Sequence, residues 1–315
     1  MRSEKLPLKL PDFYDDLLAK SIFISGLPRS GTTLLGKIVG TFNNLEYHFE
    51  PPSFYLIMSL YASSFLSLDQ AKIIISLLLS EELILESAHG RSINFRPNDD
   101  SLILNRMNWN ELNKRWNNIK NRYEAIEFCK QKKLRLCVKT PIIFDSLDLI
   151  RETIREPLFL IIVRNGFDVV NSIINKGWLS KDALSRDLWP YINNNSPLNI
   201  PYWVKDEYRE RWSKMSPLLR TVLMWNIHAE IYNSLDHKKD IIEIRYENLL
   251  NKPNEVISFL EKKLGTQKNS FTERWIESIL SNKKDYDKNK MFDLIYKEDA
   301  DIASKFLYLN NTWKY

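Results

Sequence analysis

Short apolar runs alternate with longer stretches of helical period along this chain. Runs of five to seven residues bounded by Gly, Pro or charged residues are typical of buried strands. Such runs cover residues 21–25, 44–49, 134–138, 157–163 and 240–245. The fourth, with its uninterrupted Leu-Phe-Leu-Ile-Ile-Val, is typical of the centre of a parallel sheet. Helical patterns fill much of the sequence between them.

A glycine-bounded loop joins the first predicted strand to a predicted helix. Gly26, Pro28 and Gly31 interrupt the apolar pattern, and a helical period begins at Thr32. A strand, loop and helix in this order direct backbone N–H groups and the positive end of a helix dipole at one point. The loop therefore predicts a phosphate site. The alternative is an ordinary glycine turn that opens a core helix.

The glycine spacing is that of a P-loop, but the lysine that a nucleoside triphosphatase needs is missing. Thr32 follows the second glycine, the next lysine is Lys37, and the cation of the loop is Arg29. The Walker lysine reaches the β- and γ-phosphates of a nucleotide. A loop with hydroxyls and no such lysine suits a single phosphate group.

Polar residues stand where three of the predicted strands end. Glu50 follows the second strand, Lys139 the third and Arg164 the fourth. In an open α/β sheet, ligands bind beyond the carboxyl ends of the strands. We therefore expect these three side chains beside the phosphate loop. Each also has a structural alternative: a solvated glutamate, a surface lysine and an arginine that caps a sheet edge.

The segment 28–33, Pro-Arg-Ser-Gly-Thr-Thr, resembles the 5′-phosphosulfate loop of the sulfotransferases that use 3′-phosphoadenosine 5′-phosphosulfate (PAPS). Arg164 with Ser172 eight residues later resembles the 3′-phosphate element of that family. Lys139-Thr140 and the segment 246–249, Tyr-Glu-Asn-Leu, resemble two further family segments. The resemblance covers about residues 20–265.

The resemblance implies a role for each matching residue. The 5′-phosphate would be held by Ser30, Gly31, Thr32 and Thr33. The 3′-phosphate would be held by Arg164 and Ser172, with Tyr246 near the nucleotide. Arg29 would neutralise the leaving oxygen and Lys139 would hold the sulfuryl oxygens.

The residue expected as the catalytic base differs from the one used in one branch of the family. Cytosolic members carry a catalytic histidine at the position that Pro141 occupies here. The chain is therefore more similar to the carbohydrate- and protein-type members, which use a glutamate. Glu50 is the first candidate for the base, and His48, expected on the same strand face, is the second.

These features imply a fold and a reaction. We expect one α/β domain over residues 1–315, of the P-loop three-layer type, with a central parallel sheet flanked by helices and a helical extension over 266–315. The implied reaction moves a sulfuryl group from PAPS to a hydroxyl or amine of a small-molecule or glycan acceptor, without a metal, and leaves adenosine 3′,5′-bisphosphate. An ATP-dependent kinase with a degenerate P-loop and a non-catalytic nucleotide-binding protein of the same fold are the alternatives.

Composition limits the class of ligand and the cellular setting that the sequence supports. The net charge of +5 suits a small anionic ligand and is too weak to argue for nucleic acid. Cys129 and Cys137 lack metal or redox spacing, and no signal peptide is evident, so a reduced, cytoplasmic setting is expected. The apolar region 51–85 is broken by Asp69 and Lys72. It predicts two buried helices and no transmembrane segment, with a membrane-surface role as the alternative.

Three further regions are less informative. Residues 177–207 are expected to form a long aromatic loop, either a lid or a segment pinned to the body. A long helix is expected over 209–235, restarting at Pro217. Arginines scattered over 91–115 are expected to be solvated, with a contact to an anionic acceptor group as the alternative. The lysines at 283, 284, 288 and 290 are expected to form a solvated charge run, and the alternative is that they cover the 3′-phosphate. The sequence makes no prediction about the oligomeric state.

Overall fold

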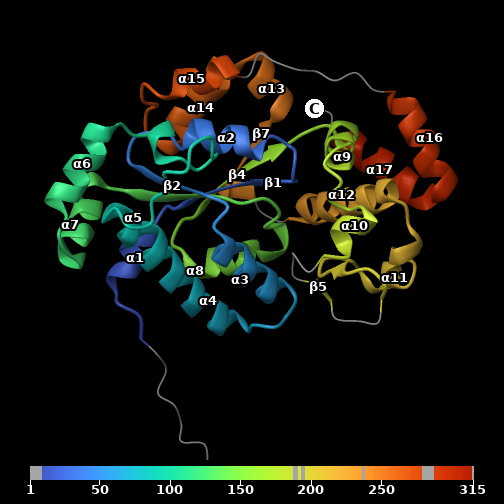
Figure 1. The fold of residues 1–315 in the computed structure, drawn as a ribbon, viewed down its shortest axis with the longest axis horizontal. Coiled ribbons are helices and arrows are strands. Elements are labelled where there is room, and N and C mark those ends of the chain that lie inside the picture. The colour runs from blue at the N-terminus through green and yellow to red at the C-terminus, as the bar shows by residue number, and fades with distance from the viewer. Residues whose placement is uncertain (1–8, 187–190, 193–195, 236–237, 279–286, 314–315) are drawn as a thin grey trace, which may run out of the picture.

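A five-stranded parallel sheet forms the centre of the computed structural model, which describes residues 9–186, 191–192, 196–235, 238–278 and 287–313 (Figure 1). The strands are β1 (Ile22–Gly26), β2 (Leu45–Phe49), β3 (Arg135–Lys139), β4 (Leu158–Val163) and β7 (Ile241–Arg245). Their order across the sheet is β2-β3-β1-β4-β7. The predicted α/β fold is confirmed, and each strand starts one residue later than the sequence pattern indicated.

The sheet separates two hydrophobic cores because side chains alternate along each strand. Ile22 and Ile24 of β1 pack into one core, while Phe23 between them packs into the other. Leu160 and Phe159 of β4 divide in the same way. Both faces of the sheet are therefore buried, which explains why the strands are continuous apolar runs.

One face of the sheet is covered by helices from two distant parts of the chain (Figure 1). These are α2 (Thr32–Val39), α13 (Tyr246–Asn251), α14 (Pro253–Leu264) and α15 (Thr272–Glu277). Helix α2 lies so close to the sheet that a Cβ at Gly36 would lie 2.4 Å from the hydroxyl of Tyr47 on β2. The phosphate loop thus opens a helix that packs directly on the strands.

The opposite face is covered mainly by the segment after β2. It consists of α3 (Pro52–Ala62), α4 (Leu68–Leu77), a π-helical segment (Leu78–Leu85) and α5 (Glu86–Ala88), together with α1 (Phe13–Leu18) and α8 (Leu147–Thr153). A 3-10 turn (Phe144–Ser146) precedes α8. Two helices were predicted here, and the structure has a break between them and a π-helical continuation of the second. Among the described residues, no helix is long and apolar enough to cross a membrane.

A third group of helices packs beside β4 and β7. Its members are α9 (Gly166–Ile174), α12 (Pro217–Ser234), α16 (Lys288–Glu298) and α17 (Ala300–Thr312). Helix α12 begins at Pro217, so the restart expected there is confirmed, while residues 209–216 do not form the first part of one long helix. Proline favours the first helical position because its missing N–H needs no partner there. Before it stand α11 (Asp206–Arg209) and a 3-10 turn (Trp212–Lys214).

The remaining elements are short or lie at the edge. Helices α6 (Trp109–Asn118) and α7 (Arg122–Lys132), with a 3-10 turn (Ile103–Asn105), lie beyond β2. The predicted aromatic loop contains α10 (Lys181–Leu184) and the strand pair β5 (Tyr191–Ile192) and β6 (Ile200–Pro201), while residues 187–190 and 193–195 are outside the described part. A 3-10 turn (Lys238–Asp240) precedes β7.

A buried charge cluster joins the β2 edge of the sheet to α6. Glu46 is fully buried and accepts hydrogen bonds from Arg106 at 3.0 Å, Arg115 at 2.8 Å and Ser87 at 2.7 Å. The expectation that these two arginines are solvated is wrong, because both guanidinium groups neutralise a carboxylate in the core. Arg115 and Arg106 hold the pKa of Glu46 well below its usual range, although burial alone would raise it.

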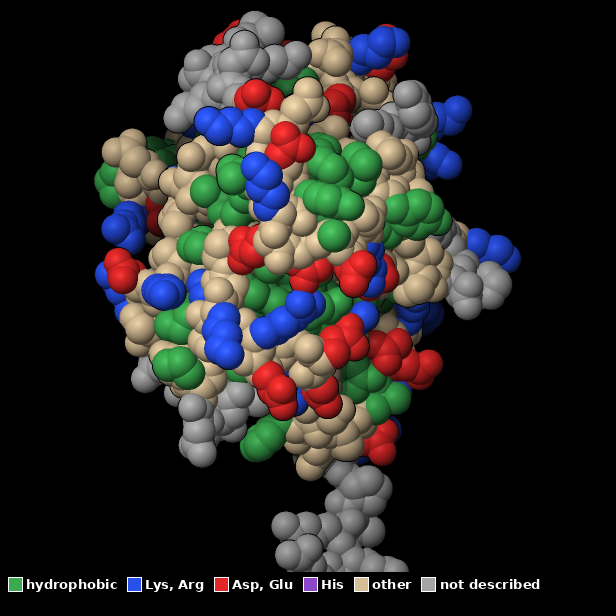
Figure 2. Space-filling model, turned by 90° about the vertical axis from the view of Figure 1, so that its right-hand side faces the viewer, with side chains coloured by type: hydrophobic (Ala, Val, Ile, Leu, Met, Phe, Trp, Pro, Cys, Tyr) green, Lys and Arg blue, Asp and Glu red, His purple; other side chains and the backbone are tan. Residues whose placement is uncertain are grey.

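Lys288 and Asp168 form an ion pair at 3.6 Å, so this lysine has a partner, while Lys283 and Lys284 lie outside the described residues. Figure 2 shows the face that carries α16 and α17. Basic and acidic side chains are interspersed on it. This face presents a mixed surface instead of a stripe of one charge.

Candidate functional site

The phosphate loop has the backbone geometry that its glycines indicated. Gly26 and Gly31 adopt φ angles of 155° and 102°, which side chains other than glycine rarely allow. A Cβ at Gly31 would also lie 2.3 Å from the ring of Tyr246. Gly31 is the N-cap of α2, so the loop delivers its backbone N–H groups to the positive end of that helix.

Two arginines and a serine meet across this loop. The Arg29 Nε donates to Ser172 Oγ at 3.1 Å, and the Arg164 guanidinium donates to the carbonyl oxygen of Arg29 at 3.0 Å. Arg164 also lies 4.3 Å over the ring of Tyr246. Residues that the sequence placed in two separate phosphate elements are therefore neighbours in space.

One detail of this cluster differs from the prediction. Helix α9 begins at Gly166, two residues before the predicted start, so Ser172 lies deeper in the helix than one turn. In the structure the hydroxyl of Ser172 contacts Arg29. Trp178 of the aromatic loop lies 5.8 Å from the Arg29 guanidinium.

Lys139 and Glu50 form a second charged group at the carboxyl ends of β3 and β2. Lys139 is 1% exposed, and its ammonium forms a short ion pair with the Glu50 carboxylate and donates to Thr33 Oγ1 at 3.3 Å. Burial lowers the pKa of Lys139, and Glu50 opposes that shift. The Glu50 backbone N–H donates to the Lys139 carbonyl at 2.7 Å. The carboxylate therefore lies beside the first turn of α2.

His48 lies apart from this group. The φ angle of Glu50 is +43°, so the chain leaves the strand alternation and turns the carboxylate toward Lys139. His48 remains on the side of Glu46 and the Leu83 backbone, and the shared face expected for His48 and Glu50 is not observed. Burial lowers the pKa of His48 to about 4. The imidazole is therefore neutral at pH 7.

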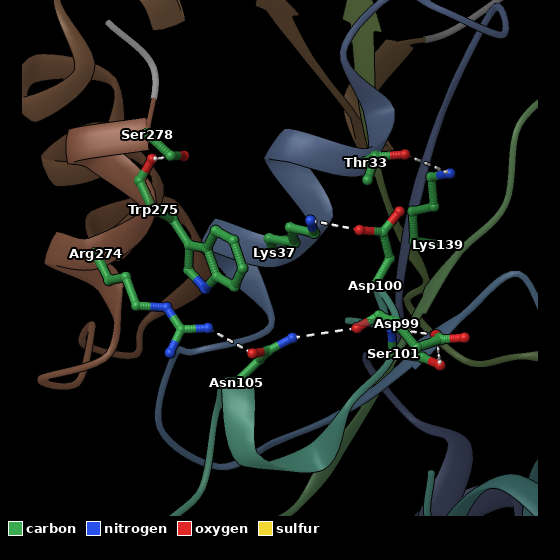
Figure 3. A network of polar contacts seen from close by, with 10 residues as sticks. All are labelled: Thr33, Lys37, Asp99, Asp100, Ser101, Asn105, Lys139, Arg274, Trp275 and Ser278. Atoms are coloured by element: carbon green, nitrogen blue, oxygen red, sulfur yellow. Dashed lines mark hydrogen bonds and ion pairs between the residues drawn. The ribbon is translucent and has the colours of Figure 1, made fainter. Parts of the chain in front are cut away.

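A cavity of about 360 Å³ runs along α2 from the loop. Its walls include Arg29, Gly31, Thr32, Thr33, Leu34, Lys37, Asp100, Arg164, Tyr246, Trp275 and Ser278. Sequence reasoning found the end of the cavity near the loop and missed Asp100, Trp275 and Ser278, as well as any role for Lys37. Figure 3 shows these residues converging from α2, the 99–101 segment and α15. They carry no motif, and only tertiary structure brings positions 37, 100 and 275 together.

Several buried polar atoms around the loop lack a partner among the described residues. They are Ser25 Oγ, Ser30 Oγ, Thr140 Oγ1 and Arg164 Nε. Buried polar groups in native proteins are nearly always hydrogen-bonded. These unpaired polar atoms lie close to the loop, and the adjoining cavity is lined by the cations Arg29, Lys37 and Arg164, so this region fits an anionic ligand. No group of three metal-ligating side chains occurs in the described part of the chain.

Comparison with known proteins gives a family match and distant structural likenesses. The model of a family described as "Sulfotransferase family" matches residues 21–270. No curated protein matches this sequence. Similar solved structures include the sulfotransferase domain of the Synechococcus PCC 7002 olefin synthase, at 16% identity and TM-score 0.46, covering 98% of this chain and 99% of that one. The sulfotransferase STF9 of Mycobacterium avium has 9% identity and TM-score 0.48, and the match covers 94% of this chain and 77% of that one. Mouse sulfotransferase SULT7A1, complexed with PAP, has 13% identity and TM-score 0.40, and the match covers 94% of this chain and 92% of that one.

Proposed function

Because the chain belongs to the sulfotransferase family, we propose that it transfers a sulfuryl group from PAPS to a hydroxyl or amine of an acceptor. The observation that carries the proposal is that the glycine loop and Arg164 line a single cavity, with Ser172 in contact with Arg29 of the loop. A nucleotide with a 5′-phosphosulfate and a 3′-phosphate has two anionic groups to place. The loop and the Arg164 guanidinium beside it offer a binding group for each.

The donor would be held by the loop and by the end of β4. The N–H groups of residues 30–33 and the hydroxyls of Ser30, Thr32 and Thr33 suit the 5′-phosphate at the start of α2. Arg164 and Ser172 suit the 3′-phosphate, because a guanidinium fork can bind two phosphate oxygens. The guanidinium of Arg164 lies over the ring of Tyr246, and this contact limits the movement of the fork.

The transfer step needs positioned charges more than covalent catalysis, by analogy with phosphoryl transfer. The acceptor oxygen forms a bond to sulfur, and the bond from sulfur to the bridging oxygen breaks. The electron pair of that bond remains on the leaving 5′-phosphate, where Arg29 neutralises it. Lys139 stabilises the sulfuryl oxygens, and the acceptor proton passes to Glu50.

Glu50 is favoured over His48 as the base by position. Its carboxylate is 42% exposed and contacts Lys139, the proposed sulfuryl ligand. His48 Nε2 is enclosed and lies on the side of Glu46. A carbohydrate hydroxyl is the first acceptor class to test, because family members with a glutamate base act on such groups.

Calorimetry with adenosine 3′,5′-bisphosphate, beside ATP with Mg²⁺, tests the donor site. We expect tight binding of the bisphosphate without metal and weak binding of ATP. A preference for Mg-ATP would overturn the 3′-phosphate assignment and support a kinase. If neither nucleotide binds and no acceptor is turned over, the sulfotransferase proposal fails.

Substitution of Arg164 localises the 3′-phosphate. We expect Arg164→Ala to weaken adenosine 3′,5′-bisphosphate binding about 10- to 100-fold while changing AMP binding little, since a charge-assisted bidentate contact is lost. Arg164→Lys keeps the charge without the fork and should recover only part of the affinity. Arg155→Ala, on an exposed arginine paired with Asp16, is the matched control. Equal losses for the bisphosphate and AMP would contradict the assignment.

A further inference from the structure

A lysine–aspartate pair forms part of the cavity wall away from the loop. Lys37 Nζ lies 2.5 Å from Asp100 Oδ1, and both residues line the cavity. The Lys37 ammonium also lies 4.6 Å over the ring of Trp275. Figure 3 shows the pair between the Trp275 side and the Thr33 side of the network. None of these three residues belongs to a motif recognised in the sequence.

The pair is held in place from two sides. Arg274 lies 4.8 Å from the ring of Trp275 and donates to Asn105 Oδ1 at 2.5 Å. Asn105 in turn donates to the Asp99 carbonyl at 3.4 Å. Helix α15 and the segment 99–105 are therefore linked around Lys37. A carboxylate and an ammonium fixed this way present one acceptor and one donor to the cavity.

The pair lies away from the arginines that suit phosphates. Lys37 is six residues past Gly31, about 9 Å along the helix axis at the usual rise. Leu34, Trp275 and Ser278 also line this cavity. Asp100 would repel a phosphate, but a carboxylate neutralised by Lys37 suits the uncharged part of a nucleotide. That part is the base.

We propose that Lys37 and Asp100 read the edge of the nucleobase, and that they select adenine. Asp100 accepts a hydrogen bond from the exocyclic amino group, and Lys37 donates to ring nitrogen N7, which is an acceptor in adenine and in hypoxanthine alike. Trp275 positions Lys37 from behind. Hypoxanthine carries a carbonyl oxygen in place of the amino group, so its oxygen would face the Asp100 carboxylate and be repelled. This inference rests on the proposed function, because it assumes a nucleotide donor.

Calorimetry with adenosine 3′,5′-bisphosphate and inosine 3′,5′-bisphosphate tests the assignment. We expect the unmodified protein to prefer the adenosine compound by about tenfold or more. In Asp100→Asn the preference should fall below about threefold, because the amide can donate to the inosine carbonyl. Lys37→Met should weaken the binding of the adenosine compound, because the donor to the ring nitrogen is lost. Asp99→Asn removes the same charge one residue away, outside the cavity wall, and should keep the preference.

Distinct results would overturn the inference. It fails if the unmodified protein does not discriminate, or if Asp100→Asn keeps the full preference. It also fails if Asp100→Asn tightens both compounds equally, since Asp100 would then act only as a repelling charge. An equal loss of preference in Asp99→Asn would indicate a loop effect and reject base reading. If neither bisphosphate binds to the unmodified protein, the donor proposal itself fails.

Discussion

Three residues with left-handed backbone angles lie at the carboxyl ends of neighbouring strands. Arg29, Glu50 and Ile142 have φ angles of 68°, 43° and 54° after β1, β2 and β3. Such conformations cost about 1–3 kcal/mol each and are retained mainly at functional sites. The β-branched Ile142 is the most unfavourable of the three, and its N–H donates to the Gly26 carbonyl at 3.1 Å. These three are among nine non-glycine residues with positive φ in the described part of the chain, and they lie beside the place where the transfer step is proposed.

Glu50→Gln tests the base. We expect kcat to fall about 10²- to 10⁴-fold, the usual contribution of a general base, while the affinity for adenosine 3′,5′-bisphosphate stays within about twofold. The amide keeps the size of the side chain but cannot take a proton. Steady-state kinetics and calorimetry on the same preparation separate the two effects.

Glu156→Gln is the matched control for that variant, because Glu156 is an exposed glutamate that pairs with Lys20. It should leave both quantities unchanged. Unchanged turnover in Glu50→Gln would return the role of base to His48. That outcome would be checked with His48→Gln.

Because His228 is buried, we expect the protein to lose stability in mild acid. This histidine is fully buried on α12 beside Trp203, and burial lowers its pKa to about 3. The unfolded chain therefore binds more protons than the folded one between pH 6.5 and 3, and stability falls as the pH falls through that window. At pH 5 the loss from this group is about 2 kcal/mol.

Urea unfolding of the unmodified protein and His228→Leu at pH 7.5 and pH 5 measures the effect. The variant should lose about 2 kcal/mol less than the unmodified protein between these pH values. An identical pH dependence in both proteins would reject His228 as the source. His48, with a pKa lowered to about 4, contributes in the same direction and is unchanged in both proteins.

The residues that sequence reasoning predicted share one property, which is their position at a strand end. Glu50, Lys139 and Arg164 could be placed at one edge of the sheet because Pro or Gly marks where each strand stops. Asp100 and Trp275 come from a loop and a short helix, and no local pattern relates positions so far apart. Glu50 also shows a limit of strand alternation, because one left-handed residue moved its carboxylate away from the side of His48.

Among the elements, the strands were predicted to within one residue and the helices less well. The strand bounds follow from burial on both faces, which requires continuous apolar runs. The π-helical segment Leu78–Leu85 could not be predicted, since its apolar pattern does not distinguish π from α hydrogen bonding. The arginines at 106 and 115 were assigned to solvent because Glu46, their partner, lies in a strand 60 residues or more away.

The Glu46 cluster predicts a large cost when its carboxylate is removed. Glu46→Ala leaves Arg106 and Arg115 with no counter-charge in a nearly buried site, and we expect a loss of about 3–5 kcal/mol in the free energy of unfolding. Urea denaturation provides the measurement. Glu127→Ala, at an exposed ion pair on α7, should cost less than about 1 kcal/mol. A cost for Glu46→Ala as small as that of the control would show that the cluster contributes little.

We propose that residues 1–315 form one domain that unfolds as a unit. Phe306 of α17 is fully buried, with its ring 5.0 Å from Trp225 and 4.8 Å from Phe167. Trp313 lies 5.1 Å from Trp225. Removing two such buried aromatic side chains, at about 3–5 kcal/mol each, costs about as much as the whole stability of a typical domain. The helices of the predicted C-terminal extension therefore contribute side chains to the hydrophobic core.

Truncation after residue 287 tests this proposal. We expect the shortened chain to be insoluble or to lack a cooperative unfolding transition, whereas the full chain shows one transition by both fluorescence and circular dichroism. The substitution Phe306→Ala is the milder form and should cost about 3–5 kcal/mol. A truncated chain that still unfolds cooperatively and binds adenosine 3′,5′-bisphosphate would show two independent units.

Asn310 on α17 has a consequence for the time at which the site forms during synthesis. Its side-chain carbonyl accepts the N–H of Gly166 at 2.6 Å, at the start of α9 and two residues after Arg164. The arginine proposed for the 3′-phosphate thus depends on a residue translated 146 positions later. A nascent chain whose residue 310 has not yet emerged from the ribosome lacks this contact. We therefore expect nucleotide binding to appear only after residue 310 has left the ribosome.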